Sequence, residues 1–224
     1  MLPDPLIATN ADYADALITA RRAKNLLILL LLLMVLGQLA LFFTARFTNL
    51  VIPGPIPSVN DVTAAAATQS VASDWVNQLR YLVGLTLFLG MALSFVLTGV
   101  LLLTVLMAIV RQLVGVGRLT SAFVWSLLLI VLLFPWQAFL NNAGMTLTEF
   151  KVPGILYTWP ELVKTAKFAN DAPLPYVVLK WARFVAFPLI AVIILLAVQV
   201  KSNRGLRQAL GGDIDDVLPP THEV

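Results

Sequence analysis

The stretch that decides the fold is YLVGLTLFLGMALSFVLTGVLLLTVLMAIV, residues 81–110, which contains no charged side chain. As an α-helix it is about 45 Å long, because each residue adds about 1.5 Å. The hydrocarbon core of a bilayer is about 30 Å thick, so one helix of this length crosses it with residues to spare. We therefore expect this stretch to span a membrane, either tilted or continued into the interface.

Three further apolar runs flank this stretch, and we place four spans at about residues 25–43, 81–110, 119–140 and 176–200. Hydrophobic residues make up 59% of the chain and charged residues 12%, whereas soluble proteins have about 45–50% and about 25%. The composition predicts an all-α polytopic membrane protein without a separate soluble domain.

The expected organisation is a polar inner-side segment at residues 1–24, a four-span bundle at 25–200 and a polar inner-side tail at 201–224. Two larger outer loops separate the spans, and both carry the signature of a helix start. Ser58-Val59-Asn60-Asp61 and Thr158-Trp159-Pro160-Glu161 match the capping box, in which side chains accept from unpaired amides at a helix start.

The first of these helices is expected to run through the alanine-rich residues 63–72 into the second span. The second is expected to be short and amphipathic, with Trp159 and Leu162 on its apolar face and Glu161 on its polar face. Two prolines lie inside apolar runs. We expect Pro135 to loosen the end of the third span and Pro188 to kink the fourth.

Basic residues near the spans set the expected orientation, because cytoplasmic loops carry an excess of Lys and Arg. Eight of the 15 lie on the side that carries both termini: Arg21, Arg22, Lys24, Arg111, Arg118, Lys201, Arg204 and Arg207. We therefore predict an integral protein of a bacterial cytoplasmic membrane with both termini cytoplasmic.

Several chemistries lack the residues they need. The chain has no Cys, and its one histidine, His222, lies in the polar tail, which excludes disulfides, cysteine zinc sites and a haem held by two histidines of this chain. All twelve acidic residues lie outside the four spans, so we expect no intramembrane proton relay, no metal and no cofactor. The basic residues are spread between apolar runs, so we expect no nucleic-acid partner.

Gly90, Ser94 and Thr98 recur every four residues within the second span. Small residues at this spacing allow another helix backbone to approach closely. The pattern predicts a helix-packing seam, and the alternative is the wall of a pore or of a ligand groove.

Lys180 and Arg183 lie three residues apart near the start of the fourth span and share a helix face. The ordinary interpretation is that both side chains snorkel to water at the membrane surface. The alternative is that they contact lipid headgroups or another anion.

Aromatic residues are concentrated on the predicted outer side. Four of them form a possible outer docking surface: Trp75, Trp136, Trp159 and Trp181. Anchoring of the loops at the membrane interface explains such residues without a partner, whereas a docking surface for a lipid or a protein requires that they be covered.

No motif identifies a reaction. The leading hypothesis is a non-catalytic integral membrane subunit, structural or accessory, that packs with other membrane proteins in a complex and contacts membrane lipids. One alternative is a transporter or channel component for a lipid or apolar solute, without an intramembrane proton relay. A weaker one is a lipid-headgroup enzyme that acts from the outer loop, with Glu149, Glu161 or Asp171 as acid or base.

Overall fold

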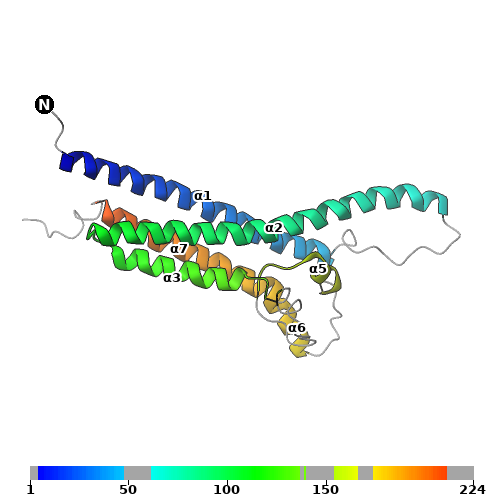
Figure 1. Ribbon diagram of the computed structural model, residues 1–224. Helices are drawn as coiled ribbons and strands as arrows, with labels where there is room; N and C mark the ends of the chain where they lie inside the picture. Colours follow the sequence, from blue (N-terminus) through cyan, green and yellow to red (C-terminus); the bar gives the residue numbers. More distant parts are fainter. Residues whose placement is uncertain (1–4, 48–61, 137–138, 140–153, 166–173, 211–224) are drawn as a thin grey trace, which may run out of the picture. The chain divides into compact units, whose positions relative to one another are not determined.

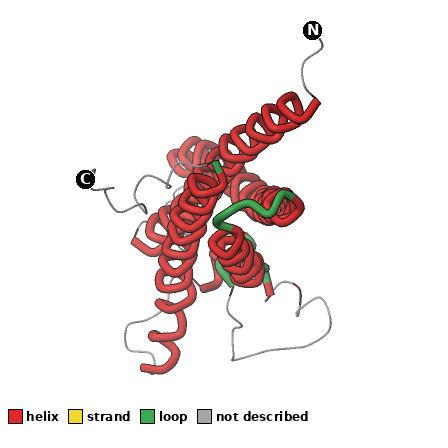
Figure 2. Tube along the Cα trace, turned by 90° about the vertical axis from the view of Figure 1, so that its left-hand side faces the viewer, coloured by secondary structure: helices red, strands yellow, loops and turns green. Residues whose placement is uncertain are grey.

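The computed structural model describes residues 5–47, 62–136, 139, 154–165 and 174–210, and within them the elements are all helical (Figure 1). In chain order these are α1 (Pro5–Phe47), α2 (Val62–Val110), α3 (Val116–Leu133), α5 (Trp159–Thr165), α6 (Leu174–Trp181), the π-helix η1 (Ala182–Ala186) and α7 (Phe187–Ala209). Figure 2 shows the described chain as helices joined by loops, without a strand.

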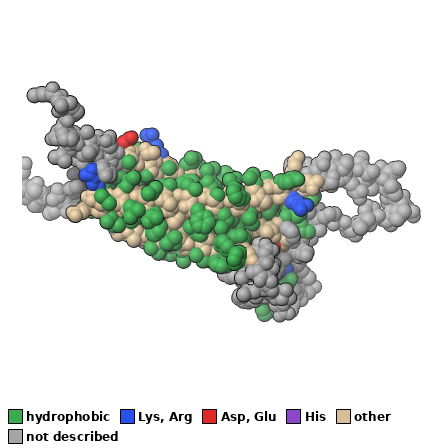
Figure 3. Space-filling view, in the orientation of Figure 1, with side chains coloured by type: hydrophobic (Ala, Val, Ile, Leu, Met, Phe, Trp, Pro, Cys, Tyr) green, Lys and Arg blue, Asp and Glu red, His purple; other side chains and the backbone are tan. Residues whose placement is uncertain are grey.

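Four helical segments are long and apolar enough to cross a membrane: Asp15–Phe47, Val76–Val110, Val116–Leu133 and Leu174–Ala209. Large apolar side chains are exposed along all four, and on the face drawn in Figure 3 Lys and Arg appear only in small patches. Monomeric soluble proteins rarely expose an apolar surface of this extent to water. The prediction of an all-α chain with four helices long and apolar enough to span a membrane is confirmed.

Two helices extend beyond the spans predicted from sequence. α1 passes from the polar start into the first apolar run without a break at residue 24, and α2 includes the alanine-rich residues 63–72. The expected helix over that run is confirmed. The capping box at residues 58–61 lies outside the described residues.

α2 ends in a Schellman motif. The amide of Leu113 donates to the carbonyl of Ala108 at 2.9 Å, and the amide of Gln112 donates to that of Ile109 at 3.0 Å. Gln112 has φ +51°, the left-handed conformation that this motif requires and that glycine usually provides. Leu113 packs on the adjacent apolar core, so the short link to α3 is closed by hydrogen bonds and by burial.

α3 ends at Leu133, before the predicted end at Leu140, because Pro135 disfavours helix in the residue that precedes it. Its last carbonyls find other donors. The indole of Trp136 donates to Val131 O at 2.8 Å and the amide of Ile155 donates to Leu132 O at 3.1 Å. The returning loop therefore caps the helix end, as buried carbonyls require.

The fourth span begins as α6 and continues through η1 into α7. The amide of Phe187 donates to Ala182 O, five residues back, which defines the wider π-turn. Pro188 follows directly; it lacks an amide hydrogen and crowds the carbonyl four residues before it. The kink expected at Pro188 takes the form of this π-turn, and it carries Arg183 and Phe184 into buried positions.

The contacts divide the chain into two compact units. Unit 1 comprises Met1–Leu32, Leu93–Ile130 and Ile193–Val224, and unit 2 comprises Leu33–Ala92 and Val131–Val192. The core of unit 1 takes buried residues from α1, α2, α3 and α7: Leu17, Val105, Ala108, Leu119 and Leu206. The core of unit 2 takes them from α1, α2, α5, η1 and the loop before α5: Phe42, Ala45, Val83, Tyr157, Leu162 and Phe184.

Candidate functional site

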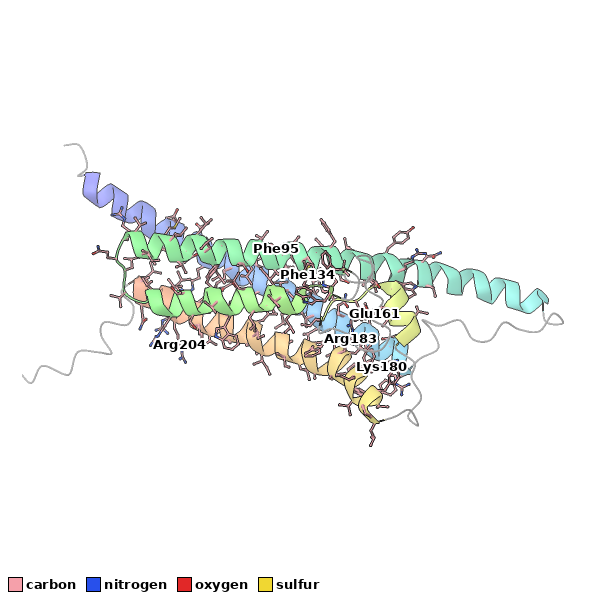
Figure 4. The ribbon with its side chains drawn as sticks, turned by 60° about the horizontal axis from the view of Figure 1, so that its bottom comes forward. Phe95, Phe134, Glu161, Lys180, Arg183 and Arg204 are labelled. Carbon is pink, nitrogen blue, oxygen red and sulfur yellow. The ribbon has the colours of Figure 1, made fainter. Side chains whose placement is uncertain are left out.

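A buried ion pair lies at the centre of unit 2. Arg183 of η1 and Glu161 of α5 are joined through Nη2 and Oε1, with side-chain exposures of only 4% and 9%. Figure 4 shows the two side chains turned toward each other from their separate helices. Each charge provides the other with the partner that a buried charge needs.

Aromatic rings pack beside this pair. Phe184 follows Arg183 in η1 and stacks on Phe42 of α1, with ring centroids 4.6 Å apart and an interplanar angle of 3°. Tyr157 packs edge-on against Phe184 at 5.5 Å, and Trp181 packs against Phe42 in the same manner at 6.1 Å. Because these rings exclude water, the attraction between the two charges is screened less than at a surface.

Tyr157 connects the loop before α5 to α1. Its hydroxyl donates to the backbone carbonyl of Gln38 at 2.6 Å. Burial, and secondarily the negative charge of Glu161, raises the pKa of Tyr157 well above its ordinary value of 10.0. The phenol therefore remains protonated and acts as a hydrogen-bond donor across the physiological pH range.

Gln38 and Thr86 link α1 to α2 beside this contact. Gln38 Nε2 donates to Thr86 Oγ1 at 2.8 Å, and Thr86 Oγ1 donates to the carbonyl of Val83 at 2.9 Å. Within the described part of the chain, Gln38 Oε1 is buried and accepts no hydrogen bond. The amide of Gln38 and the hydroxyl of Thr86 therefore bind each other across the two helices.

The snorkelling expected of Lys180 and Arg183 is wrong, because both side chains are 4% exposed. Arg183 binds Glu161, and the Lys180 ammonium lies 4.2 Å from the centroid of the Tyr176 ring. The π-turn at residues 182–186 explains the burial of Arg183, since it changes the direction in which this residue points. Contact of either residue with a lipid headgroup or another anion stays a prediction.

The polar face predicted for the short outer helix is wrong at one position. α5 forms as expected and buries Leu162, but Glu161 is turned inward and does not face water. Sequence reasoning had assigned Glu161 to the solvent side because charged residues on a surface helix usually lie there. The ion pair with Arg183, which is distant in the sequence, places the Glu161 side chain on the buried side of α5 instead.

A second buried polar cluster lies in unit 1. Lys24 of α1 is 1% exposed, and its ammonium donates to Ser202 Oγ at 2.8 Å and to Asn203 Oδ1 at 2.5 Å, both on α7. One turn away, Gln199 Nε2 donates to Asn25 Oδ1 at 3.1 Å. In the described residues no carboxylate lies within ion-pair distance of Lys24, so its partners there are neutral.

Sequence analysis does not predict the burial of Lys24. It counts this residue with the basic residues that set the expected orientation of the chain in the membrane. The polar pair Ser202-Asn203 is visible in the sequence. What the sequence did not indicate is that this pair meets a cation 178 residues earlier in the chain.

The predicted packing seam divides between the units. In unit 2, a Cβ built on Gly90 lies 3.3 Å from Leu156, a residue of the loop before α5, so its closest neighbour there is a loop side chain. In unit 1, Ser94 and Thr98 are buried, and the Thr98 hydroxyl donates to the carbonyl of Ser94 in its own helix at 2.9 Å. Whether these three residues pack against another protein stays a prediction.

The proposed docking tryptophans are engaged within unit 2 where their side chains are described. Trp136 donates to Val131 O, and Trp159 and Trp181 are partly buried against the unit 2 core. The side chain of Trp75, like all of Glu149 and Asp171, lies outside the described residues. Docking of a partner on this surface stays a prediction.

The described residues show no metal site and one open depression. In the described residues no three His, Cys, Asp or Glu side chains are grouped so as to hold a metal ion. A shallow, open depression lies on α2 and is lined by Arg80, Tyr81, Leu82, Gly84 and Leu85.

Comparison with known proteins gives no family. No protein-family model matches the chain, and no curated protein or solved structure matches it either.

Proposed function

We propose that this chain is a non-catalytic integral membrane subunit that packs with partner proteins in a larger membrane assembly. We further propose that it belongs to a bacterial cytoplasmic membrane, with both termini on the cytoplasmic side and with unit 2 contributing the outer loops.

The observation that carries the proposal is the ion pair between Arg183 and Glu161. A transporter or an enzyme keeps its charged groups available to a solute, a proton or a substrate. Here the arginine of the fourth span is bound by the chain's own loop helix, which fastens the loop on unit 2. This arrangement favours a rigid scaffold.

Two sets of hydrogen bonds between spans support the same interpretation. Gln38 binds Thr86, and Lys24 binds Ser202 and Asn203. Hydrogen bonds between helices that are satisfied internally add rigidity in a membrane. The surface left for partners is apolar, with Phe88 and Phe95 exposed by 68% and 55% along α2.

The two alternative functions have less support. A transport pathway along the face of Gly90 has to accommodate Leu156, which packs on that glycine. Headgroup chemistry at Glu161 has to accommodate the ion pair with Arg183.

Crosslinking in intact membranes tests the proposal. The tagged full-length chain is crosslinked in its own host membrane, extracted in mild detergent and measured by light scattering after size exclusion. The expected result is a complex well above the 24.4 kDa of one chain, with a second protein in fixed stoichiometry. A particle that contains this chain alone, before and after crosslinking, would overturn the proposal.

The orientation has its own test, which benefits from the absence of Cys in the chain. Asn77→Cys on α2 and Gln112→Cys in the link to α3 each introduce one exposed thiol. In intact cells a membrane-impermeant maleimide is expected to label the first variant and to label the second only after lysis. The reverse pattern would invert the assigned orientation.

A further inference from the structure

A cationic cluster in unit 1 is formed by residues of α3 and α7, and no part of the proposed function uses it. Its centre is Lys201 of α7, whose ammonium donates to Ser121 Oγ of α3 at 2.8 Å. The same ammonium lies 5.3 Å from the centroid of the Trp125 ring. A lysine at this position is therefore held by two contacts to the neighbouring helix.

Two arginines extend the cluster toward the same end of the two helices, because α3 and α7 run antiparallel. Arg118 lies three residues before Ser121 on α3, and Arg204 lies three residues after Lys201 on α7, so each shares a helix face with its neighbour. Both are exposed, and Arg204 is labelled in Figure 4. In the described structure neither guanidinium has a hydrogen-bond or ion-pair partner.

The charge of this cluster is not neutralised by the helices that form it. Neither α3 nor α7 contains an Asp or Glu residue. Lys201 uses one of its three N–H donors on Ser121, and an ammonium that is held in place with free donors is suited to a phosphate oxygen.

Exposed apolar side chains lie next to the cations of this cluster. Trp125 is 37% exposed, and Leu128, on the same face of α3, is 49% exposed. On α7, Val200 lies one turn before Arg204 and is 47% exposed. Cations beside a tryptophan and exposed aliphatic side chains match the two parts of a phospholipid, the phosphate and the acyl chains.

We propose that the cationic cluster formed by Arg118, Ser121, Trp125, Lys201 and Arg204 binds the phosphodiester headgroup of an anionic membrane phospholipid. Lys201 contacts the phosphate from between the helices, and the two arginines contact it one turn nearer to the link between α2 and α3. The acyl chains lie along Trp125, Leu128 and Val200. This site differs from the cations near the start of the fourth span, which are buried.

Native mass spectrometry of the purified full-length chain tests the site. The protein in mild detergent is titrated with phosphatidylglycerol or with phosphatidylcholine of the same acyl chains, and the dissociation constant is taken from the fraction of lipid-bound protein. We expect phosphatidylglycerol to bind more tightly. One cation near a membrane surface contributes enough that its loss weakens binding about fivefold.

Three charge-removing variants and one control locate the effect. Lys201→Gln, Arg204→Gln and Arg118→Gln are each expected to weaken binding of phosphatidylglycerol about fivefold. Arg22→Gln removes an exposed charge from α1 of the same unit and is expected to change it less than twofold. Arg204 and Arg118 make no described hydrogen bond or ion pair, so these two variants report on the site even if Lys201→Gln perturbs folding.

Three results would overturn the proposal. They are equal binding of the two lipids, an equal loss in Arg22→Gln and the site variants, and displacement of the lipid by millimolar inorganic phosphate, which would make the cluster a phosphate site. The measurement uses the isolated chain, so it succeeds or fails independently of the proposed role in a membrane assembly.

Discussion

The two units bury a cation in different ways. In unit 2 the guanidinium of Arg183 is neutralised by Glu161, a carboxylate that reaches it from a short helix outside the spans. In unit 1 the ammonium of Lys24 is held by the neutral oxygens of Ser202 and Asn203 on a facing helix. One unit uses a loop to balance a charge, and the other uses helix-to-helix hydrogen bonds.

The difference teaches how a mostly apolar chain gains specificity. Apolar surfaces in lipid have little preference for one partner over another, so polar contacts select which segments meet. In unit 2 the ion pair selects the position of α5 against η1. In unit 1 the hydrogen bonds of Lys24 select the facing positions of α1 and α7. The two clusters should therefore respond differently when their cation is altered.

The largest effect is expected when the ion pair of unit 2 loses one member. Glu161→Gln leaves the buried charge of Arg183 without its counter-charge, which costs about 3 kcal/mol or more of unfolding free energy. SDS-induced unfolding in mixed micelles, followed by tryptophan fluorescence, measures the loss.

The double variant Glu161→Gln with Arg183→Met is the control, because it removes both charges together. It is expected to recover more than half of the loss, since replacing a whole buried pair is often nearly neutral. A single-variant loss below about 1 kcal/mol would mean that the pair is effectively solvated, and the comparison between the units would fail.

A second prediction asks whether unit 1 depends on close backbone contact. Gly115 has φ +96°, and a Cβ there would lie 2.8 Å from the carbonyl oxygen of Gly205. Gly115→Ala is expected to cost about 2–3 kcal/mol in the same unfolding assay, from backbone strain together with the clash. Gly117→Ala is the matched control, because nothing lies within 4 Å of a Cβ at that position and it is expected to be neutral or slightly stabilising.

The cation of unit 1 provides a smaller effect. Lys24→Met keeps an unbranched side chain of similar length and removes a charge whose described partners are neutral. The expected loss of unfolding free energy is about 1–2 kcal/mol, because Asn203 Oδ1 loses a donor while the Ser202 hydroxyl keeps its bond to Val198 O. A loss as large as that of Glu161→Gln would show that the two clusters do not differ in kind.

The smallest effect at neutral pH is expected at Tyr157. Tyr157→Phe removes the hydrogen bond to Gln38 O, at a cost of about 1 kcal/mol. The pKa of this phenol is raised in the folded chain, so its contribution is fully present below about pH 10, where an unfolded tyrosine begins to ionise.

Above that pH the unfolded state loses a proton that the folded state keeps, and stability falls as pH rises. Unfolding curves between pH 9 and 11 are therefore expected to show a steeper loss in the wild-type chain than in Tyr157→Phe. Parallel pH dependences would contradict the buried environment assigned to this hydroxyl.

The helices were readable from the sequence because long uncharged runs leave few alternatives in lipid. The ends of the helices were predicted less accurately from the sequence. α3 ends at Leu133 because Pro135 acts on the residue before it, and because the carbonyl of Leu132 is capped by Ile155, which is distant in sequence. The helix over residues 63–72 was predicted from its composition and is present.

The buried charges could not be predicted from pattern alone. The position of Arg183 depends on a π-turn, for which Pro188 was the only signal, and that signal predicted a kink without its form. Glu161 lies in a seven-residue helix, too short for its periodicity to determine which face is buried. Lys24 depends on partners at the opposite end of the chain.

The π-turn of η1 has a consequence for how this chain tolerates length changes. A π-turn holds one more residue than the corresponding α-helical turn, so deletion of a single residue within Ala182–Ala186 would restore ordinary helical winding. α6 would then keep nearly the same phase relative to the helix that follows, because an α-helical turn completes about the same rotation with one residue fewer. A deletion within α6 itself would instead turn the residues before it by about 100°, so η1 is the place where this span tolerates the loss of one residue.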